Sequence, residues 1–238
     1  MNRIAVGLSL LLLSAPLHAQ EGGAMTVSYV EGVATMKPAG GGVAGPLAEG
    51  DPLHEGDTVQ TPPGGRLEIS VANGTMIRLG ESSRLLLGTA PAAGHAFSAK
   101  LFLGNLWTKV RKLVSGETFH IETENGVAGV RGTEFRVEAG GKGDLVRVYE
   151  GAVEVKGAAG WEHRVEPGHE LSFRRDRPPA GPRAFELASE RGNKFMKWVR
   201  ERPARPSAQP DRVEPGHRAP PERREPPEHH EKRREHGR

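Results

Sequence analysis

The stretch Phe119–Phe135, FHIETENGVAGVRGTEF, decides the fold. It predicts two short strands joined by a glycine-punctuated turn, with Arg131 inside the turn and buried-looking. No residue in it forms part of a nucleophile, metal-ligand or phosphate-loop pattern. The stretch therefore indicates a scaffold or binding module rather than an enzyme.

The same design of strand, glycine bend and second strand recurs three times elsewhere. It is found at Val27–Met36, Leu101–Val110 and Val146–Val155. Asn73-Gly74 lies between two alternating runs and predicts a type I′ hairpin. Many short strands with glycine corners predict an all-β fold, a solenoid-like or sandwich-like roll over residues 25–173.

Three features of this β region allow a second interpretation. Asp51 and Asp57 each follow a glycine and predict turns, although paired aspartates could also bind calcium or act as a general acid and base. Gly126–Gly132 superficially suggests a phosphate-binding loop, but strands flank it and no helix follows. Trp161 is expected at the core or its rim, or at a hairpin tip where it could stack on a glycan.

Composition limits the function classes. The 238 residues include no cysteine, which excludes disulfides, thiolate metal sites and cysteine nucleophiles. Residues 1–19 predict a cleavable signal peptide, with a basic start, an apolar run and cleavage after Ala19. We therefore expect a periplasmic or secreted protein that has no integral membrane span after cleavage.

The composition changes after Phe173. Residues 174–182 predict a polar linker, and 183–201 predict one amphipathic helix that covers an open end of the β unit or docks on a partner or membrane. Residues 202–238 are rich in proline, arginine, glutamate and histidine and predict a disordered tail. The tail is a solvated spacer, or it touches anionic surfaces weakly, or His217, His229, His230 and His236 bind a metal weakly.

Several motifs in order resemble the FecR domain family. They are Glu-Gly-Asp-x-Val-x-Thr (Glu55–Thr61), Ala-Asn-Gly-Thr-x-Ile-Arg-Leu (Ala72–Leu79), Leu-x-x-Gly-x-Leu-Trp (Leu101–Trp107), Phe-x-Ile-x-Thr-x-x-Gly-Val-Ala-Gly-Val-Arg-Gly-Thr-Glu-Phe (Phe119–Phe135), Val-Tyr-Glu-Gly-x-Val-x-Val (Val148–Val155) and Glu-Pro-Gly-His (Glu166–His169). The resemblance implies a β-rich, solenoid-like, non-catalytic domain. In the family's iron regulators this domain relays a signal from an outer-membrane transporter to a sigma factor.

The resemblance also implies a set of structural motif residues. They are Gly56, Asp57, Thr61, Asn73, Gly74, Gly104, Gly129, Arg131, Gly132, Thr133, Phe135, Glu150, Gly151 and Gly168. Arg131 is expected either to satisfy turn carbonyls or pair with Glu134, or to anchor a partner. Where the regulators carry an anti-sigma segment and a membrane helix, this sequence predicts a signal peptide.

The sequence therefore predicts a non-enzymatic envelope module that binds a protein or polymer. We expect no catalytic residue, cofactor, metal or nucleic-acid partner, because no hydrolase, zinc or nucleotide motif is present and the basic balance lies in the tail. The alternatives are a tail-anchored structural or adhesion protein, an accessory of FecR-like iron-responsive signalling and, remotely, a glycan hydrolase.

Overall fold

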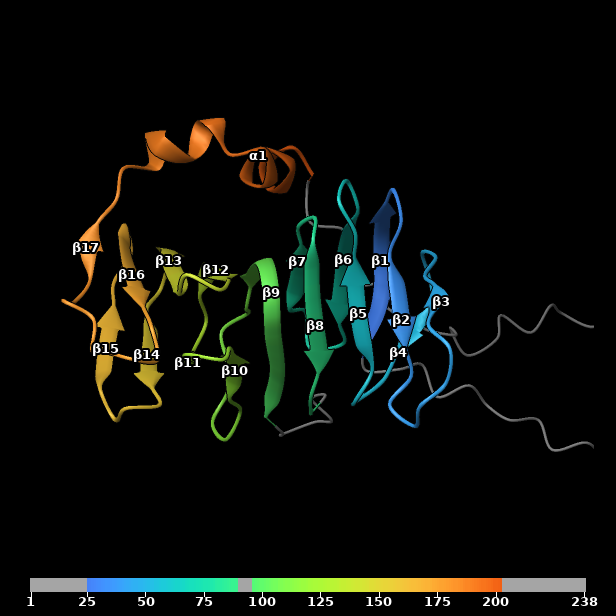
Figure 1. Ribbon diagram of the computed structural model, residues 1–238, viewed down its shortest axis with the longest axis horizontal. Helices are drawn as coiled ribbons and strands as arrows, with labels where there is room; N and C mark the ends of the chain where they lie inside the picture. Colours follow the sequence, from blue (N-terminus) through green and yellow to red (C-terminus); the bar gives the residue numbers. More distant parts are fainter. Residues whose placement is uncertain (1–24, 90–95, 203–238) are drawn as a thin grey trace, which may run out of the picture. The chain divides into compact units, whose positions relative to one another are not determined.

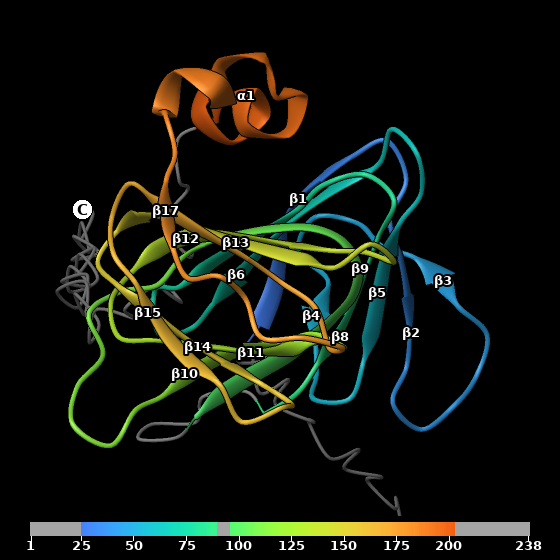
Figure 2. The same ribbon diagram turned by 60° about the vertical axis from the view of Figure 1, so that its left-hand side comes forward.

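The computed structural model describes residues 25–89 and 96–202, which form two β-sheets facing each other (Figures 1 and 2). Sheet A runs β4 (Pro52–Leu53), β1 (Met25–Glu31), β6 (Arg66–Val71), β7 (Met76–Leu79), β9 (Phe97–Lys109), β12 (Glu134–Ala139), β13 (Asp144–Glu150), β16 (His169–Phe173) and β17 (Arg183–Ala184). Sheet B runs β3 (Gly45–Pro46), β2 (Thr35–Lys37), β5 (Thr58–Thr61), β8 (Ser83–Leu87), β9, β10 (Phe119–Glu122), β11 (Gly126–Val130), β14 (Val153–Gly157) and β15 (Glu162–Val165). This confirms the predicted all-β roll.

Strand β9 belongs to both sheets and joins them. Its first half pairs with β8 and β10, and its second half pairs with β7 and β12. The switch occurs at Gly104, whose φ of +102° is a conformation that side chains rarely adopt. A Cβ there would also overlap Ser83, so the chain can change sheets at this point only with glycine.

The three repeated strand pairs are three crossings between the sheets. The first passes from β1 to β2 through Gly32, the second lies within β9, and the third passes from β13 to β14 through Gly151. Gly151 has φ +77°, and a Cβ on it would lie 2.5 Å from Cγ2 of Thr133 and 2.6 Å from the Gly132 carbonyl oxygen. The motif glycines therefore allow neighbouring corners to pack against each other.

The stretch 119–135 contains three strands, so the prediction of two strands is wrong, whereas the predicted turn that holds Arg131 is present between β11 and β12. Gly126–Val130 is itself strand β11, paired with β10 on one side and β14 on the other. Glycine gives this strand a low β-propensity, but a Cβ at Gly126 would lie 2.6 Å from the Lys156 carbonyl oxygen. Close approach of the neighbouring strand explains why a glycine-rich segment is extended here.

The hairpin at Asn73-Gly74 is not of type I′. That turn needs positive φ at both residues, but only Gly74 has it, at +85°. The Gly74 N–H donates to the Val71 carbonyl at 2.9 Å, and Oδ1 of Asn73 accepts from the Thr75 N–H at 2.9 Å. The connection is a type I turn closed by a left-handed glycine, which the Asn73 side chain stabilises.

The main core lies between the sheets. Phe97 and Phe119 stack with ring centroids 4.6 Å apart, and Phe135 meets Phe119 edge-on at 6.4 Å. All three are fully buried among aliphatic residues from both sheets. Because each strand alternates its side chains between two faces, sheets A and B also each present an outer face.

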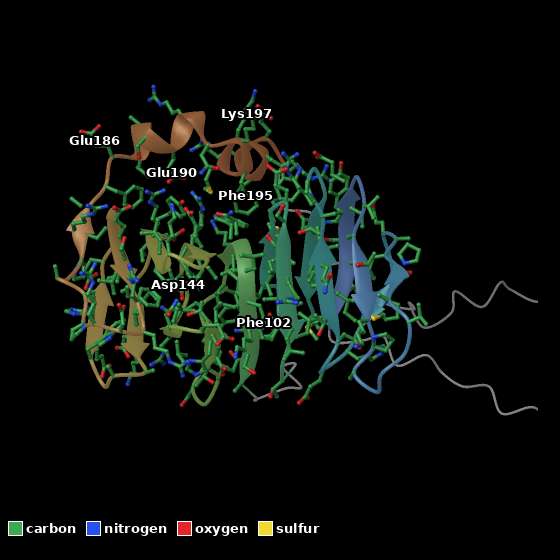
Figure 3. All side chains as sticks on the ribbon, in the orientation of Figure 1. Phe102, Asp144, Glu186, Glu190, Phe195 and Lys197 are labelled. Atoms are coloured by element: carbon green, nitrogen blue, oxygen red, sulfur yellow. The ribbon has the colours of Figure 1, made fainter. Side chains whose placement is uncertain are left out.

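A C-terminal segment covers the outer face of sheet A, and we call residues 186–202 the strap. It contains a 3₁₀-helix, η1 (Leu187–Gly192), and an α-helix, α1 (Lys194–Glu201). The single helix expected over 183–201 is wrong in extent, because Oδ1 of Asn193 accepts from the Met196 N–H and starts a new helix there. Phe195, Met196, Trp198 and Val199 form a second apolar cluster with Met76 and Trp107 of the sheet. The strap thus covers a sheet face rather than an open edge (Figures 1 and 3).

One continuous line of opposed residues crosses sheet A beneath the strap, and we call it the sheet A row. Its members are Tyr29, Glu68, Arg78, Trp107, Arg136, Arg147, Glu170 and Arg183, each opposite the next in the strand register. Five of the eight are buried, although six of the eight are charged. Their charges are therefore matched by pairing with one another and with the strap.

Within the described ranges, no helix has the length and apolar character needed to cross a bilayer. The predicted signal peptide and residues 203–238 of the predicted tail lie outside the described residues.

Candidate functional site

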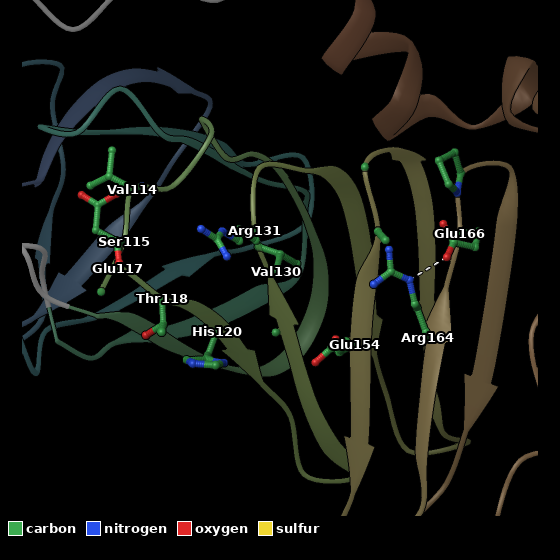
Figure 4. Close-up of a pocket in the computed structure, with 15 residues that line it drawn as sticks. Val114, Ser115, Glu117, Thr118, His120, Val130, Arg131, Glu154, Arg164 and Glu166 are labelled. Atoms are coloured by element: carbon green, nitrogen blue, oxygen red, sulfur yellow. Dashed lines mark hydrogen bonds and ion pairs between the residues drawn. The ribbon is translucent and has the colours of Figure 1, made fainter.

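A groove of about 870 Å³ opens on the outer face of sheet B, at the end where its strands cross to sheet A (Figure 4). One wall is the loop 114–118, which leads into β10. The other boundary is formed by three corners, at Arg131, at Gly151-Ala152 and at Glu166-Pro167. The motif turn of the opening stretch therefore borders the groove.

The floor of the groove is a second cross-strand line, which we call the sheet B row. It consists of His120, Gly129, Glu154 and Arg164, each opposite the next on β10, β11, β14 and β15. Gly129 leaves the middle of this line without a side chain, and a Cβ there would lie 3.1 Å from Nδ1 of His120. The glycine thus creates the hollow, and the imidazole lies beside it.

The loop wall is held by one carboxylate. Glu117 accepts a hydrogen bond from the Val114 N–H at 2.9 Å and another from the Arg111 guanidinium. The Val114 bond first, and then the Arg111 bond and charge, lower the pKa of Glu117. Glu117 is therefore ionised, and both of its carboxylate oxygens are occupied by these bonds, which hold the loop in place.

Arg131 is an exposed cation at the border of the groove. Its guanidinium points towards the loop that carries Ser115 and Glu117 (Figure 4). It makes no hydrogen bond or ion pair with any residue in 25–89 or 96–202. The expectation of a buried arginine that satisfies turn carbonyls or pairs with Glu134 is wrong. Glu134 instead pairs with Lys109, Nζ to Oε2 at 3.2 Å, because it lies opposite Lys109 in the ladder.

Three more charged residues line the groove, besides Arg131 and Glu117. Arg164 pairs with Glu166, Nε to Oε1 at 2.6 Å, and both side chains are more than half exposed. Glu154 is exposed between them and Gly129 on the floor. The groove thus presents a free guanidinium and a carboxylate on either side of a hollow.

The remaining motif residues build corners and turns. Asp57 is buried after Gly56 and accepts from the N–H groups of His54 at 2.9 Å and Ala39 at 3.1 Å, which is the turn-building role expected of it. The Thr61 hydroxyl donates to the Gly80 carbonyl at 2.6 Å. Gly132 and Gly168 have φ of +78° and +75° at crossings between the sheets, and Glu150 is exposed beside Lys109.

The phosphate-loop and glycan interpretations do not fit these contacts. The backbone of β11 is paired on both edges, so its N–H groups do not form a cradle. Trp161 is half-buried, packs edge-on against Phe173 at 5.5 Å and lies over Gly157. No cluster of three or more metal-ligating side chains occurs in the part of the chain that the structure describes.

The groove contains the residue types of a hydrolytic triad, but not its geometry. Ser115, His120 and Glu117 all line it. No hydrogen bond joins any two of them within the described residues, and the Glu117 carboxylate is bound to Arg111 and Val114. A triad needs the acid oriented on the histidine and the histidine on the nucleophile. The arrangement therefore supports binding better than acyl transfer.

Sequence reasoning missed His120, Glu154 and Arg164. His120 and Glu154 are outward-facing members of predicted strands, so alternation could have placed them on a surface, whereas Arg164 lies on β15, for which no strand was predicted. Their alignment into one row depends on the register of β10, β11, β14 and β15. It depends as well on the parallel pairing of β10 with β9, which places β10 in sheet B. No local sequence signal fixes that register.

Comparisons with known proteins agree with the motif pattern. The sequence model of the family described as FecR protein matches residues 57–154. Two crystal structures of a protein described as "a putative anti-sigma factor" from Parabacteroides distasonis ATCC 8503, at 1.65 Å and 2.50 Å, each match with a TM-score of 0.50 and 16% identity. Each match covers 60% of this chain and 64% or 63% of that one, so less than two thirds of the Parabacteroides protein is represented.

No curated protein sequence matches this chain. At 16% identity the structural likeness shows the fold alone. The family match covers the floor residues His120, Gly129 and Glu154 and the Arg131 turn, and it ends before β15 and the strap. Residues 57–154 match the family described as FecR protein, and that part of the chain is therefore a FecR domain.

Proposed function

We propose that this protein is a non-enzymatic binding module of the bacterial envelope that holds a partner in the groove of sheet B. The observation that carries the proposal is Arg131. An exposed guanidinium with no intramolecular partner in the described residues lies at a corner bordered by a hollow. Five fixed donors in a planar fork make arginine suited to binding a carboxylate.

The groove's chemistry defines the partner. Arg131 would bind a carboxylate of the partner. Glu154, on the other side of the Gly129 hollow, would bind a hydrogen-bond donor or a cation of the partner. An extended segment of an envelope protein, or a polymer with carboxylate and amide groups, carries both. The predicted signal peptide supports a periplasmic location for this event.

Signalling is the context that we propose for this binding. The FecR family match and the anti-sigma description of the Parabacteroides protein support it. In this role the module is an accessory that receives a partner and does not itself perform chemistry. Adhesion through residues 203–238 remains a prediction that concerns residues outside the described structure.

Site-specific crosslinking in the native envelope tests the proposal. A photoreactive residue replacing Glu154 on the groove floor should give a defined adduct. The same residue replacing Glu122, which is exposed on β10 outside the groove lining, should not. The Glu154 adduct should disappear when Arg131→Glu is added and persist when Lys142→Ala removes an exposed cation elsewhere. Equal adducts at both positions, or none at Glu154, would refute the proposed groove.

A further inference from the structure

The sheet A row contains a carboxylate-binding position whose carboxylate comes from the strap. Arg136 and Arg147 lie directly opposite each other on β12 and β13, and like charges so placed repel. Glu190 of the strap lies between them, with Oε2 3.0 Å from Nη1 of Arg136 and Oε1 paired with Arg147. Its side chain is 1% exposed. Sheet A thus contributes the two arginines of this site, and the carboxylate that binds them comes from the strap.

The same row also recognises the end of a helix. Arg78 donates from Nη1 to the Val199 carbonyl at 2.5 Å and from Nη2 to the Arg202 carbonyl at 2.9 Å. These carbonyls belong to the end of α1, where a helix lacks internal donors and carries partial negative charge. Glu68 orients Arg78 from below with a 2.7 Å bond to Nε. The Arg78 guanidinium lies between the rings of Trp107 and Trp198, 5.1 and 5.7 Å from their centroids.

The strap fits this surface incompletely. Of the eight buried side-chain N or O atoms without a hydrogen-bond partner in the described residues, four are here, namely Nε1 of Trp107, Nε1 of Trp198, Nε of Arg136 and Nε of Arg202. Trp107 and Arg136 are 5% and 3% exposed and belong to the sheet. A buried donor without an acceptor costs free energy. A ligand that supplied acceptors to these two groups would therefore match the sheet A row better than the strap does.

The strap is also attached in a way that permits release. No backbone–backbone hydrogen bond joins residues 186–202 to a strand in the described structure, so side chains hold it. An α-helix of eight residues is not stable alone in water. The backbone pairing of the chain with sheet A ends just before the strap, at β17 and at Phe185, whose N–H donates to the Gly168 carbonyl at 2.9 Å.

We propose that the sheet A row is a docking surface for an amphipathic helix of a partner protein, and that the strap occupies it as an internal stand-in. The partner helix carries a carboxylate for Arg136 and Arg147, then two aromatic residues three positions apart, as Phe195 and Trp198 are. Its last carbonyls face Arg78. It also brings acceptors for Nε1 of Trp107 and Nε of Arg136. This surface is separate from the groove of sheet B and independent of it.

A labelled synthetic peptide of residues 186–202 is the probe, because it carries this chemistry. Its binding is measured by fluorescence anisotropy on the full chain and on Trp198→Ala, with amide hydrogen exchange as the parallel reading. Removing Trp198 loosens the internal occupant and raises the fraction of open surface, so the peptide should bind at least about tenfold more tightly. The same peptide with Glu190→Ala should lose that binding.

A second variant keeps every contact residue and guards against misfolding of Trp198→Ala. A protease site placed between Phe185 and Glu186 of the full chain, after the paired strand β17, allows the strap alone to be cut in the folded protein, after which the labelled peptide should exchange into it. Two results would overturn the proposal. One is a strap that stays protected from hydrogen exchange in Trp198→Ala. The other is a released strap, in either protein, with no peptide binding.

Discussion

The two outer faces of the roll use the same cross-strand geometry for opposite purposes. The sheet A row runs under the strap and consists largely of buried charges and aromatics, each with a partner on the sheet or the strap. The sheet B row is short, contains a glycine in its middle, and lies open beside Arg131, which has no partner among residues 25–89 and 96–202. A row of polar residues is the surface that we propose for binding on either face, and what differs is whether this chain supplies the occupant.

The difference also separates stability from recognition. Most charges on the sheet A row, Glu68, Arg78, Arg136 and Glu170, are desolvated, so losing one partner leaves the other buried and uncompensated. Charges on the sheet B row remain in water, where an ion pair contributes little to folding. The same substitution, arginine to a neutral residue, should therefore have very different consequences on the two faces.

The largest effect is expected for Arg78→Met. It removes the partner of Glu68, the cap on the last carbonyls of α1 and the cation between two tryptophans. Breaking a buried pair in this way should lower the free energy of unfolding by about 3–5 kcal/mol. Urea unfolding followed by tryptophan fluorescence measures the loss.

The double variant Glu68→Gln with Arg78→Met is the matched control. Because it leaves no unpaired buried carboxylate, it should be less destabilised than the single Arg78→Met variant. Equal losses in the two proteins would show that Glu68 contributes nothing to the cost, and that the sheet A row is held together by apolar contacts instead.

The next effect is a dependence of stability on acid. Burial raises the pKa of Glu170, but hydrogen bonds from Arg147 and Arg183, with the charges of both, outweigh it and hold the pKa below its usual range. A carboxyl group with a depressed folded pKa stabilises the fold above its unfolded pKa, about 4.3. That contribution is lost as the pH falls through the folded pKa.

We therefore expect Glu170→Gln to flatten the decline in urea midpoint below about pH 4.3. Glu166→Gln removes a carboxylate of the exposed pair on the other face, and it should leave the decline almost as steep as in the parent protein. A parent-like decline in Glu170→Gln would contradict the assignment of acid sensitivity to the sheet A row.

The sequence predicted the frame of this fold because the frame is locally encoded. Gly32, Gly104 and Gly151 mark the crossings between sheets, and alternation on either side of each marks the strands. Asp57 and Asn73 likewise stabilise their own turns through bonds to residues two to three positions away. Local signals of this kind are readable before any tertiary contact is known.

The pairing partners of the buried charged side chains could not be predicted from local sequence signals. Arg78 bonds the carbonyl of Val199, 121 positions away, and Arg136 meets Glu190 54 positions away. Pairing over such distances depends on strand register and on where the strap lies. The strap's break at Asn193 and the buried Trp198 were missed because the helical pattern was read as continuous through Gly192. Strand β11, Gly126–Val130, was missed because glycine has a low β-propensity. Its pairing with β10 and β14 is a tertiary contact that the local sequence does not reveal.

The smallest effect on folding is expected at the position that the sequence emphasised most. Arg131 is exposed and unpaired within the described structure, so Arg131→Ala should change the free energy of unfolding by less than about 0.5 kcal/mol. Urea unfolding beside Arg78→Met compares the two faces directly. An Arg131→Ala loss similar to that of Arg78→Met would mean that Arg131 stabilises the corner itself, and the division between a stabilising covered row and a recognising open row would fail. An unchanged midpoint together with a lost Glu154 crosslink would locate recognition at this guanidinium.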